Sequence, residues 1–189
     1  MWPWGHLALA YLLYSLYSRL RRGHRPTAAT ALVVAVASQV PDLVDKPLAW
    51  TFSILPTGRS LSHSLLVVVP VVALLYSLVR VRREGEGPLA VAFALGALSH
   101  LFGDALYSIA ALRFRDVSFL LWPAIPAVEY EVEQSFVAHL ALIEPSPELY
   151  FEFLLVAVAL AVWRADGYPG LATVASWPAR AWNGVTGAD

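Results

Sequence analysis

The chain contains no cysteine and few charged residues. The absence of cysteine excludes disulfides, zinc fingers, iron–sulfur clusters and thiol catalysis. Only 14% of the 189 residues are charged, whereas a soluble domain carries about a quarter. The net charge of -1 provides no positive field for nucleic acid, so we expect no nucleic-acid partner. Any metal site must therefore use imidazole and carboxylate ligands, which suit zinc, manganese or iron.

The start of the chain also lacks the pattern of a cleavable signal peptide. Residues 1–4 include no basic residue, and the arginine-rich residues 19–25 follow the first apolar stretch instead of preceding it. Hydrophobic residues make up 58% of the chain. We therefore expect the first apolar stretch to be retained as a helix and lipid to be the solvent of the fold.

Apolar stretches long enough to cross or nearly cross a bilayer recur along the chain, each near the length of about 20 residues that a span requires. They cover residues 4–20, 27–44, 61–79, 89–112 and 149–163. Residues 113–148 include Pro123 and Pro126 and predict a re-entrant or interfacial element. We predict an all-α fold, an integral membrane bundle of about five transmembrane helices. Residues 1–166 would form its single domain and residues 167–189 a short interfacial or flexible tail.

The basic residues of the loops predict the orientation. If the first loop is cytoplasmic, nine arginines lie on that side and four basic residues lie on the other. The positive-inside rule then puts the N-terminus outside. We expect a multi-pass protein of the cell (inner or plasma) membrane whose N-terminus and polar site face the extracytoplasmic side.

Ionisable residues occur at or near particular ends of these apolar stretches. They lie at the starts of the first, third and fifth stretches and toward the ends of the second and fourth. Because successive spans alternate in direction, all of them lie toward one membrane face. Ionisable groups are costly in lipid, so their presence indicates function. The set comprises His6, Asp42, Asp45, His63, His100, Asp104, Glu148 and Glu152.

Each of these residues also has an ordinary structural interpretation. His100 and Asp104 are four residues apart and share a helix face, where they could bind one ion or form a hydrogen-bonded couple. Asp42 and Asp45 could belong to a helix-end turn, and His63 to a polar helix start. Taken singly these alternatives stay open, but together on one face the residues favour a shared metal site. His139 could join it, whereas Glu129, Glu131 and Glu133 are expected to form a solvated strip.

Several short motifs occur in a definite order: Gly5-His6, Pro41-Asp42, Arg59 with His63, Ser99-His100 with Asp104, Trp122-Pro123 and Glu152. This set resembles the YdjM-type family of membrane-bound metal-dependent hydrolases over most of the chain. The chain differs at Gly58, where the family commonly has a histidine, and at Asp45, which is displaced by one residue. The order of histidines and acids is also similar, more remotely, to that of zinc-dependent phospholipase C.

The resemblance implies a membrane-embedded hydrolase that attacks a phosphoester or other ester of a lipid or amphipathic substrate with metal-activated water. It would hold one to three divalent ions, Zn²⁺ first with Mn²⁺ or Fe²⁺ as alternatives. The implied ligands are His6, Asp42, Asp45, His63, His100 and Asp104. The implied catalytic groups are Glu152 as ligand or general base, Glu148 as its support, and Arg59 as a contact for an anionic group.

A second interpretation is a non-catalytic membrane protein with several spans. Its histidine and aspartate residues would bind metal, brace helices or move ions. A conduit needs polar residues that continue across the membrane, whereas the stretches beyond the site are almost purely apolar, which favours a one-sided site. The expected partners are membrane lipid and a lipid or phosphoester substrate, and the oligomeric state stays open.

Overall fold

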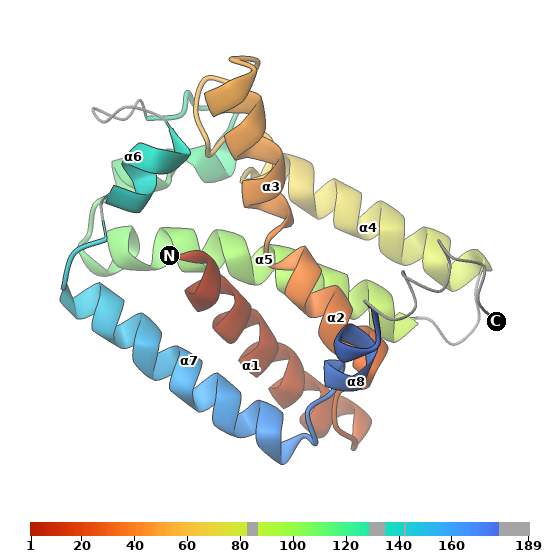
Figure 1. The fold of residues 1–189 in the computed structure, drawn as a ribbon. Helices are drawn as coiled ribbons and strands as arrows, with labels where there is room; N and C mark the ends of the chain where they lie inside the picture. The colour runs from red at the N-terminus through yellow and green to blue at the C-terminus, as the bar shows by residue number, and fades with distance from the viewer. Residues whose placement is uncertain (83–86, 129–134, 142, 178–189) are drawn as a thin grey trace, which may run out of the picture.

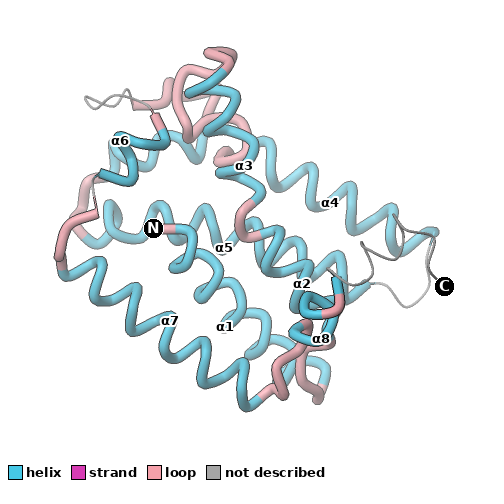
Figure 2. Tube along the Cα trace, in the orientation of Figure 1, coloured by secondary structure: helices cyan, strands magenta, loops and turns pink. Residues whose placement is uncertain are grey.

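The computed structural model describes residues 1–82, 87–128, 135–141 and 143–177, and it contains helices and loops without a strand in those ranges (Figures 1 and 2). The long helices are α1 (Pro3–Arg22), α4 (Leu65–Arg82), α5 (Gly87–Ala110) and α7 (Pro147–Ala165). A further helical segment, interrupted between its first two parts, consists of α2 (Ala28–Ala37), α3 (Val40–Lys46) and the π-helical turn Pro47–Thr51. The predicted all-α class is confirmed.

Among the described residues, two helical segments are long and apolar enough to cross a membrane, Ala28–Thr51 and Gly87–Ala110. A shorter apolar helix covers Leu65–Val79. Helices α1 and α7 are not among these candidate spans. Arginines occupy the last turn of α1, and α7 contains Glu148, Glu152 and Arg164. The predicted helical fold with apolar spans is thus confirmed in part, and the number of about five transmembrane helices is not.

Helix α5 contacts α1, α2 and α4, while α7 packs along α1 (Figure 1). Helix α5 lies close to α2 at Gly96, where an added Cβ would lie 2.7 Å from the Ala37 Cβ and 3.0 Å from the Val34 carbonyl oxygen. Small residues commonly allow such close packing of helices in lipid. The buried cluster beside this contact comprises Ala10, Tyr14, Val34 and Ala92.

The break between α2 and α3 has a local cause in Pro41. Proline has no N–H to bond the carbonyl four residues earlier, and its ring clashes with that carbonyl. The chain forms a turn at residues 38–39 and then resumes as α3, with Pro41 in its first turn. This break leaves the carbonyl of Ser38 pointing toward α5, where it becomes part of the polar site.

The segment between α5 and α7 contains the 3₁₀ helix η2 (Phe114–Leu121) and the short helix α6 (Phe136–Ala141). Its re-entrant or interfacial position stays a prediction. The acidic residues Glu129, Glu131 and Glu133 lie outside the described residues, as does the side chain of His139.

The described part of the predicted tail is a turn followed by α8 (Leu171–Ala175). Gly170 before α8 has φ +90°, and an added Cβ would lie 3.3 Å from the Leu32 side chain of α2. This segment therefore packs against the bundle. Residues 178–189 lie outside the described residues, and the division between domain and tail stays a prediction.

Candidate metal centre

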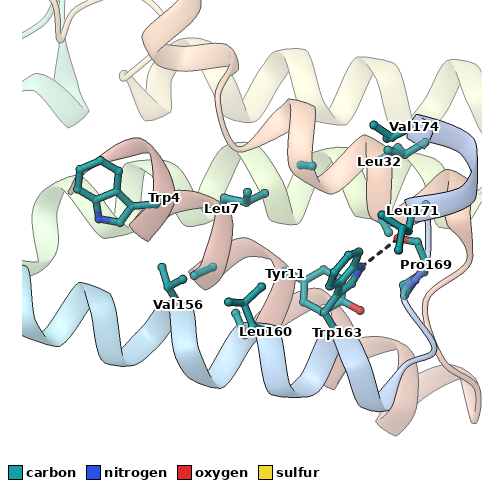
Figure 3. A pocket seen from close by; sticks show the side chains of 15 residues that line it. Trp4, Leu7, Tyr11, Leu32, Val156, Leu160, Trp163, Pro169, Leu171 and Val174 are labelled. Atoms are coloured by element: carbon teal, nitrogen blue, oxygen red, sulfur yellow. Dashed lines mark hydrogen bonds between the residues drawn. The ribbon is translucent and has the colours of Figure 1, made fainter. Parts of the chain in front are cut away.

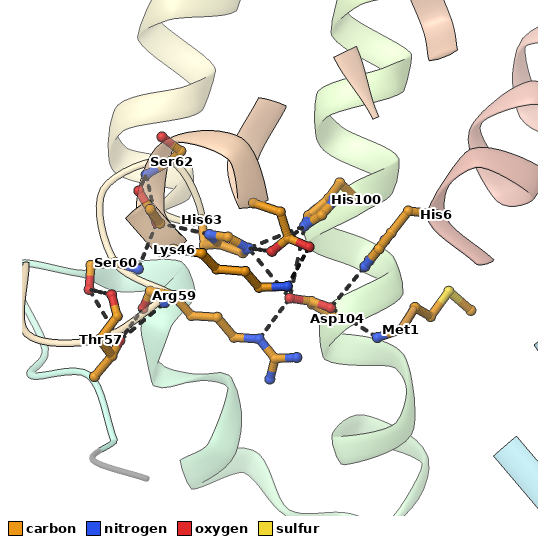
Figure 4. Close-up of polar contacts among 12 residues, drawn as sticks. Met1, His6, Lys46, Thr57, Arg59, Ser60, Ser62, His63, His100 and Asp104 are labelled. Atoms are coloured by element: carbon orange, nitrogen blue, oxygen red, sulfur yellow. Dashed lines mark hydrogen bonds and ion pairs between the residues drawn. The ribbon is translucent and has the colours of Figure 1, made fainter. Parts of the chain in front are cut away.

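The histidines and most of the aspartates predicted from the sequence lie close together. Figure 4 shows His6, His63 and His100 around Asp104. The Nε2 atom of His63, in the loop before α4, lies 3.2 Å from His100 Nε2 of α5. It is also 3.5 Å from Asp42 Oδ1 of α3 and 3.5 Å from Asp104 Oδ2 of α5. The structure thus brings residues from these separate segments together.

Most distances between these candidate ligand atoms are slightly longer than the distances between neighbouring ligand atoms of a bound zinc ion. The Nε2 atom of His100 lies 3.7 Å from Asp42 Oδ1 and 4.0 Å from Asp104 Oδ2. In a tetrahedral zinc site with bonds of about 2.0–2.1 Å, neighbouring ligand atoms are about 3.3–3.4 Å apart. Two overlapping groups have all their ligand atoms within 4.8 Å of one another, namely Asp42/His63/His100 and His6/His100/Asp104.

The outer nitrogens of the imidazoles decide which atoms face the centre. His63 Nδ1 lies 2.8 Å from Asp45 Oδ2, and His100 Nδ1 lies 2.6 Å from the Ser38 carbonyl oxygen. A carboxylate and a carbonyl can only accept, so each Nδ1 carries the hydrogen. The two Nε2 lone pairs then face each other at 3.2 Å, an arrangement that requires a proton or a cation between them.

The pKa of His63 is consistent with such a shared position. Burial lowers this pKa, but hydrogen bonds with Asp42 and Asp45 and the charge of Asp104 more than offset burial and raise the pKa above its usual value. A proton can therefore occupy the position between the two imidazoles. A metal ion binding there would displace it, which couples metal binding to proton release.

Asp45 lies behind His63 and outside both candidate ligand groups. Its carboxylate accepts hydrogen bonds from the backbone N–H groups of Ser60 at 2.8 Å and Ser62 at 2.9 Å, in addition to the contact with His63. Both oxygens are engaged away from the centre. Asp45 thus orients the imidazole and the loop before α4, a common partner of metal-binding histidines.

Asp104 connects the two groups through its two oxygens. Its Oδ1 lies 3.1 Å from His6 Nε2 and 3.0 Å from the Met1 amino group, while Oδ2 faces His63. The His6 ring stacks on His100 with centroids 3.7 Å apart. Neither ring nitrogen of His6 makes a well-aligned hydrogen bond with a described residue, although both are buried. Nδ1 has no such bond, and Nε2 has only the Asp104 contact at 3.1 Å. Buried nitrogens without a well-aligned bond are uncommon and indicate a place for a cation or water.

Two basic side chains pair with the carboxylates of this cluster. Arg59 Nε lies 2.7 Å from Asp104 Oδ2, and Lys46 Nζ lies 2.6 Å from Asp42 Oδ2. The Arg59 side chain is 29% exposed, so it occupies the margin of the centre. The structure therefore places Arg59 where it can contact both the centre and a ligand from outside.

The segment after α5 covers the centre, which the sequence did not indicate. The buried Phe119 of η2 makes an edge contact with the His63 ring, with centroids 6.1 Å apart. The guanidinium carbon of Arg59 lies 5.8 Å from the centre of the Phe119 ring. Ser64 donates a hydrogen bond to the carbonyl of Trp122, which ties this segment to the start of α4. In the sequence, the apolar residues around Phe119 were the feature that could have indicated this cover.

Glu152 lies next to the start of α1 and outside both ligand groups. Its buried carboxylate accepts hydrogen bonds from the Trp2 backbone N–H at 3.0 Å and the Tyr107 hydroxyl at 3.3 Å. An added Cβ at Gly5 would lie 2.6 Å from Glu152 Oε2, so only glycine fits there without displacing the carboxylate. Glu148 is exposed at the start of α7, and the structure does not bring it into the cluster.

A second buried polar cluster lies farther along α1. Asp166 accepts hydrogen bonds from the Tyr11 hydroxyl and the Ser15 hydroxyl, each at 2.7 Å, and forms an ion pair with Arg19. The expectation of almost purely apolar stretches beyond the site therefore fails for α1. The spacing of four residues between Tyr11, Ser15 and Arg19 was the signal for this stripe.

The fold and the site together define a helical protein with apolar candidate spans and a buried histidine–aspartate cluster that could hold a metal ion. The chain belongs to the YdjM inner membrane protein family, whose model matches residues 1–183. The family description and the apolar helices support a membrane location. No curated protein and no solved structure matches the chain. The remote similarity to phospholipase C finds no support in these comparisons.

Proposed function

We propose that this chain is a membrane-embedded, metal-dependent hydrolase with a zinc ion held by Asp42, His63, His100 and Asp104, here named the metal centre. The main support is the pair of Nε2 lone pairs that face each other at 3.2 Å beside two carboxylates. Imidazole and carboxylate ligands favour zinc, with manganese or iron as alternatives.

His6, whose buried ring nitrogens make no well-aligned hydrogen bond with a described residue, supports a second ion position. Asp104 directs Oδ1 toward His6 and Oδ2 toward His63, so Asp104 would be shared by the residues that hold either ion. His6, His100 and Asp104 already form one of the two candidate ligand groups. The proposal therefore includes one ion in the metal centre and room for a further one beside His6.

When bound, a divalent cation would polarise an ester oxygen and lower the pKa of water to near neutrality. The side chains around the metal centre would bind the substrate, exclude water and orient the ligands. Arg59 can turn from Asp104 toward an anionic phosphoester oxygen, because its side chain reaches the margin of the centre. Phe119 shields the His63 ring from water, and Asp45 keeps that ring in the tautomer whose Nε2 is free to bind.

Glu152 has the role of a positioning residue in this proposal. Its hydrogen bonds to Trp2 and Tyr107 hold the start of α1, and with it His6, against α5 and α7. The general-base role suggested by the sequence would require Glu152 to leave these partners. Glu148, exposed on α7, has no assigned role in the chemistry.

The substrate class follows from where the centre lies. The cluster occupies one end of a helical bundle whose family is a membrane family, so an ester group at headgroup level would be accessible to it. We propose a phosphoester or other ester of a lipid or amphipathic molecule as substrate. A multi-pass arrangement with the centre on the extracytoplasmic side completes the proposal.

Elemental analysis of detergent-purified protein tests the metal centre. We expect at least one zinc, manganese or iron ion per chain in the unaltered protein and loss of the ion in His100→Ala. His24→Ala is the matched control, because His24 is exposed and bonds only to the Arg25 carbonyl among its described contacts. Equal metal contents in the His100 variant and the unaltered protein would overturn the metal centre.

A panel of phosphoesters, assayed with and without chelator, tests the hydrolase activity. We expect hydrolysis that chelator abolishes and added metal restores, with no hydrolysis by the His100→Ala protein. Metal-containing protein without chelator-sensitive hydrolysis would contradict the enzyme and favour a metal-binding membrane protein.

A bracing role is the second candidate, and the basic side chains favour it. Lys46 and Arg59 pair with Asp42 and Asp104, so both carboxylates are neutralised without a metal ion. Under this alternative the purified protein contains no stoichiometric metal, and His100→Ala lowers stability without changing the metal content.

A further inference from the structure

An apolar groove with a cavity of about 390 Å³ lies between α1, α2, α7 and α8 (Figure 3). Trp4 lies toward one end of it, and Trp163 and Pro169 lie toward the other. Between them, Leu7 of α1 and Leu160 of α7 contribute to its walls. The groove therefore follows α1 along much of its first half.

The groove is separate from the metal centre. Its lining residues on α1 recur at the spacing of a single helix face, whereas His6 points to the opposite face, since each residue turns the helix by about 100°. His6 contacts α5, and the groove faces α2 and α7. The residues of α1 that line the groove are Trp4, Leu7, Ala8 and Tyr11.

The chemistry of the lining suits a hydrocarbon chain. The polar groups at the α8 end are satisfied within the protein, because the Tyr11 hydroxyl bonds to Asp166 and the Trp163 indole N–H bonds to the Pro169 carbonyl. The indole N–H of Trp4 is buried without a hydrogen-bond partner among the described residues, and the remaining lining is almost wholly apolar. A polar ligand entering the groove would therefore lose most of its hydrogen bonds to water without replacement.

The groove is open to its surroundings and lies near positive charge. Leu160 and Val174 on its walls are 56% and 53% exposed, so the groove is not sealed by protein. The ion pair of Arg19 with Asp166 holds the C-terminal ends of α1 and α7 together. Exposed arginines follow at the same end, Arg21 on α1 and Arg164 on α7. In a membrane protein, the material available to cover such a groove is lipid.

We propose that this groove binds one acyl chain of an anionic bilayer phospholipid, whose phosphate lies near the exposed arginines. The apolar walls accommodate the hydrocarbon and the arginines attract the headgroup. This lipid site does not depend on the metal centre or on hydrolysis. A lipid held here would pack between α2 and α7, which contact each other little without it, and would stabilise the bundle.

Native mass spectrometry of detergent-purified full-length chain with added phosphatidylglycerol tests the site. Ala159→Phe and Ala35→Phe fill the groove from α7 and α2, respectively, and we expect each to weaken phosphatidylglycerol binding by at least about tenfold. Ala157→Phe is the matched control, because Ala157 is exposed on α7 and does not line the groove. It should bind as the unaltered protein does.

A double variant, Arg21→Gln with Arg164→Gln, tests whether the arginines attract the anionic headgroup. We expect these changes to weaken phosphatidylglycerol binding several-fold and to leave phosphatidylcholine binding unchanged. Circular dichroism and monodisperse elution confirm that each variant is folded, and two filling variants guard against one failing to fold. Unchanged binding in a folded filling variant would overturn the site, as would equal binding of phosphatidylcholine and phosphatidylglycerol to the unaltered protein. Lipid binding retained in His100→Ala separates this result from that of the metal centre.

Discussion

The two buried polar clusters along α1 each contain a buried aspartate, but they differ in residue types and in hydrogen-bond balance. At the first, His6 contacts Asp104 and stacks on His100, whose Nε2 faces that of His63, and several acceptor atoms face one another. At the second, Asp166 is surrounded by donors, which are the hydroxyls of Tyr11 and Ser15 and the guanidinium of Arg19. At the first cluster the Nε2 lone pairs of His63 and His100 face each other, whereas at the second every named donor meets an oxygen of Asp166.

This difference distinguishes a cluster that can bind a cation from a cluster that only holds helices together. A buried carboxylate with enough donors is stable as it is, and its contribution is to hold two helices together. Imidazole lone pairs that face each other need something between them, and a metal ion meets that need while neutralising the nearby carboxylates. The pair of imidazoles whose Nε2 atoms face each other, His63 and His100, distinguishes the first cluster from the second.

The largest expected effect comes from removing an imidazole of the first cluster. His63→Ala should weaken metal binding by more than about 100-fold, the upper end for loss of an outer partner alone. Asp166→Asn, which alters the second cluster, should leave the metal affinity unchanged. Competition with a chromogenic chelator measures both. A metal affinity that falls equally in the two variants would show that the clusters do not differ as described.

Asp45 gives the next effect, because it acts on the centre through His63. Asp45→Asn should lower the metal affinity by about 10–100-fold while saturating metal still restores full occupancy. Asp116→Asn is the control, since that carboxylate is partly exposed and pairs only with Arg113 among its described contacts. Complete loss of metal at saturation would instead make Asp45 a ligand, as the sequence predicts.

The second cluster should affect stability without affecting metal. Asp166→Ala leaves the Tyr11 and Ser15 hydroxyls without their acceptor, and the free energy of unfolding should fall by about 1–3 kcal/mol. Urea unfolding of the detergent-purified protein, monitored by circular dichroism, measures the change. Asp116→Ala serves as the exposed control. An unchanged stability would remove the bracing role of Asp166.

The smallest effect is expected at Gly5, in the first turn of α1, where the lack of a side chain leaves room for the Glu152 carboxylate. Gly5→Ala should destabilise the protein by about 1 kcal/mol, because the added methyl group displaces a buried carboxylate. In a Glu152→Ala background the same substitution should cost little, since the clashing group is gone. A penalty that persists in the double variant would show that another contact requires glycine.

Much of the site could be predicted from the sequence because successive helices of a bundle alternate in direction. That rule alone brought His6, Asp42, His63 and the His100/Asp104 pair to one end, and the structure confirms their contact. The alternation of helix direction predicts at which end of the bundle a residue lies, but not which neighbouring segment its side chain faces. It could not show that Glu148 is exposed or that Phe119 covers His63, because both depend on how the segment between α5 and α7 folds back.

By itself, the sequence determined the helical class, the apolar segments and the end of the bundle at which polar residues gather, because these follow from composition and periodicity. Only the tertiary structure decided between Asp42 and Asp45, which are three residues apart in one short helix yet face opposite sides of His63. It also paired Asp166 with Arg19 across 147 residues. Hydrogen-bond direction depends on which partner each atom meets, and that is decided by packing between distant segments.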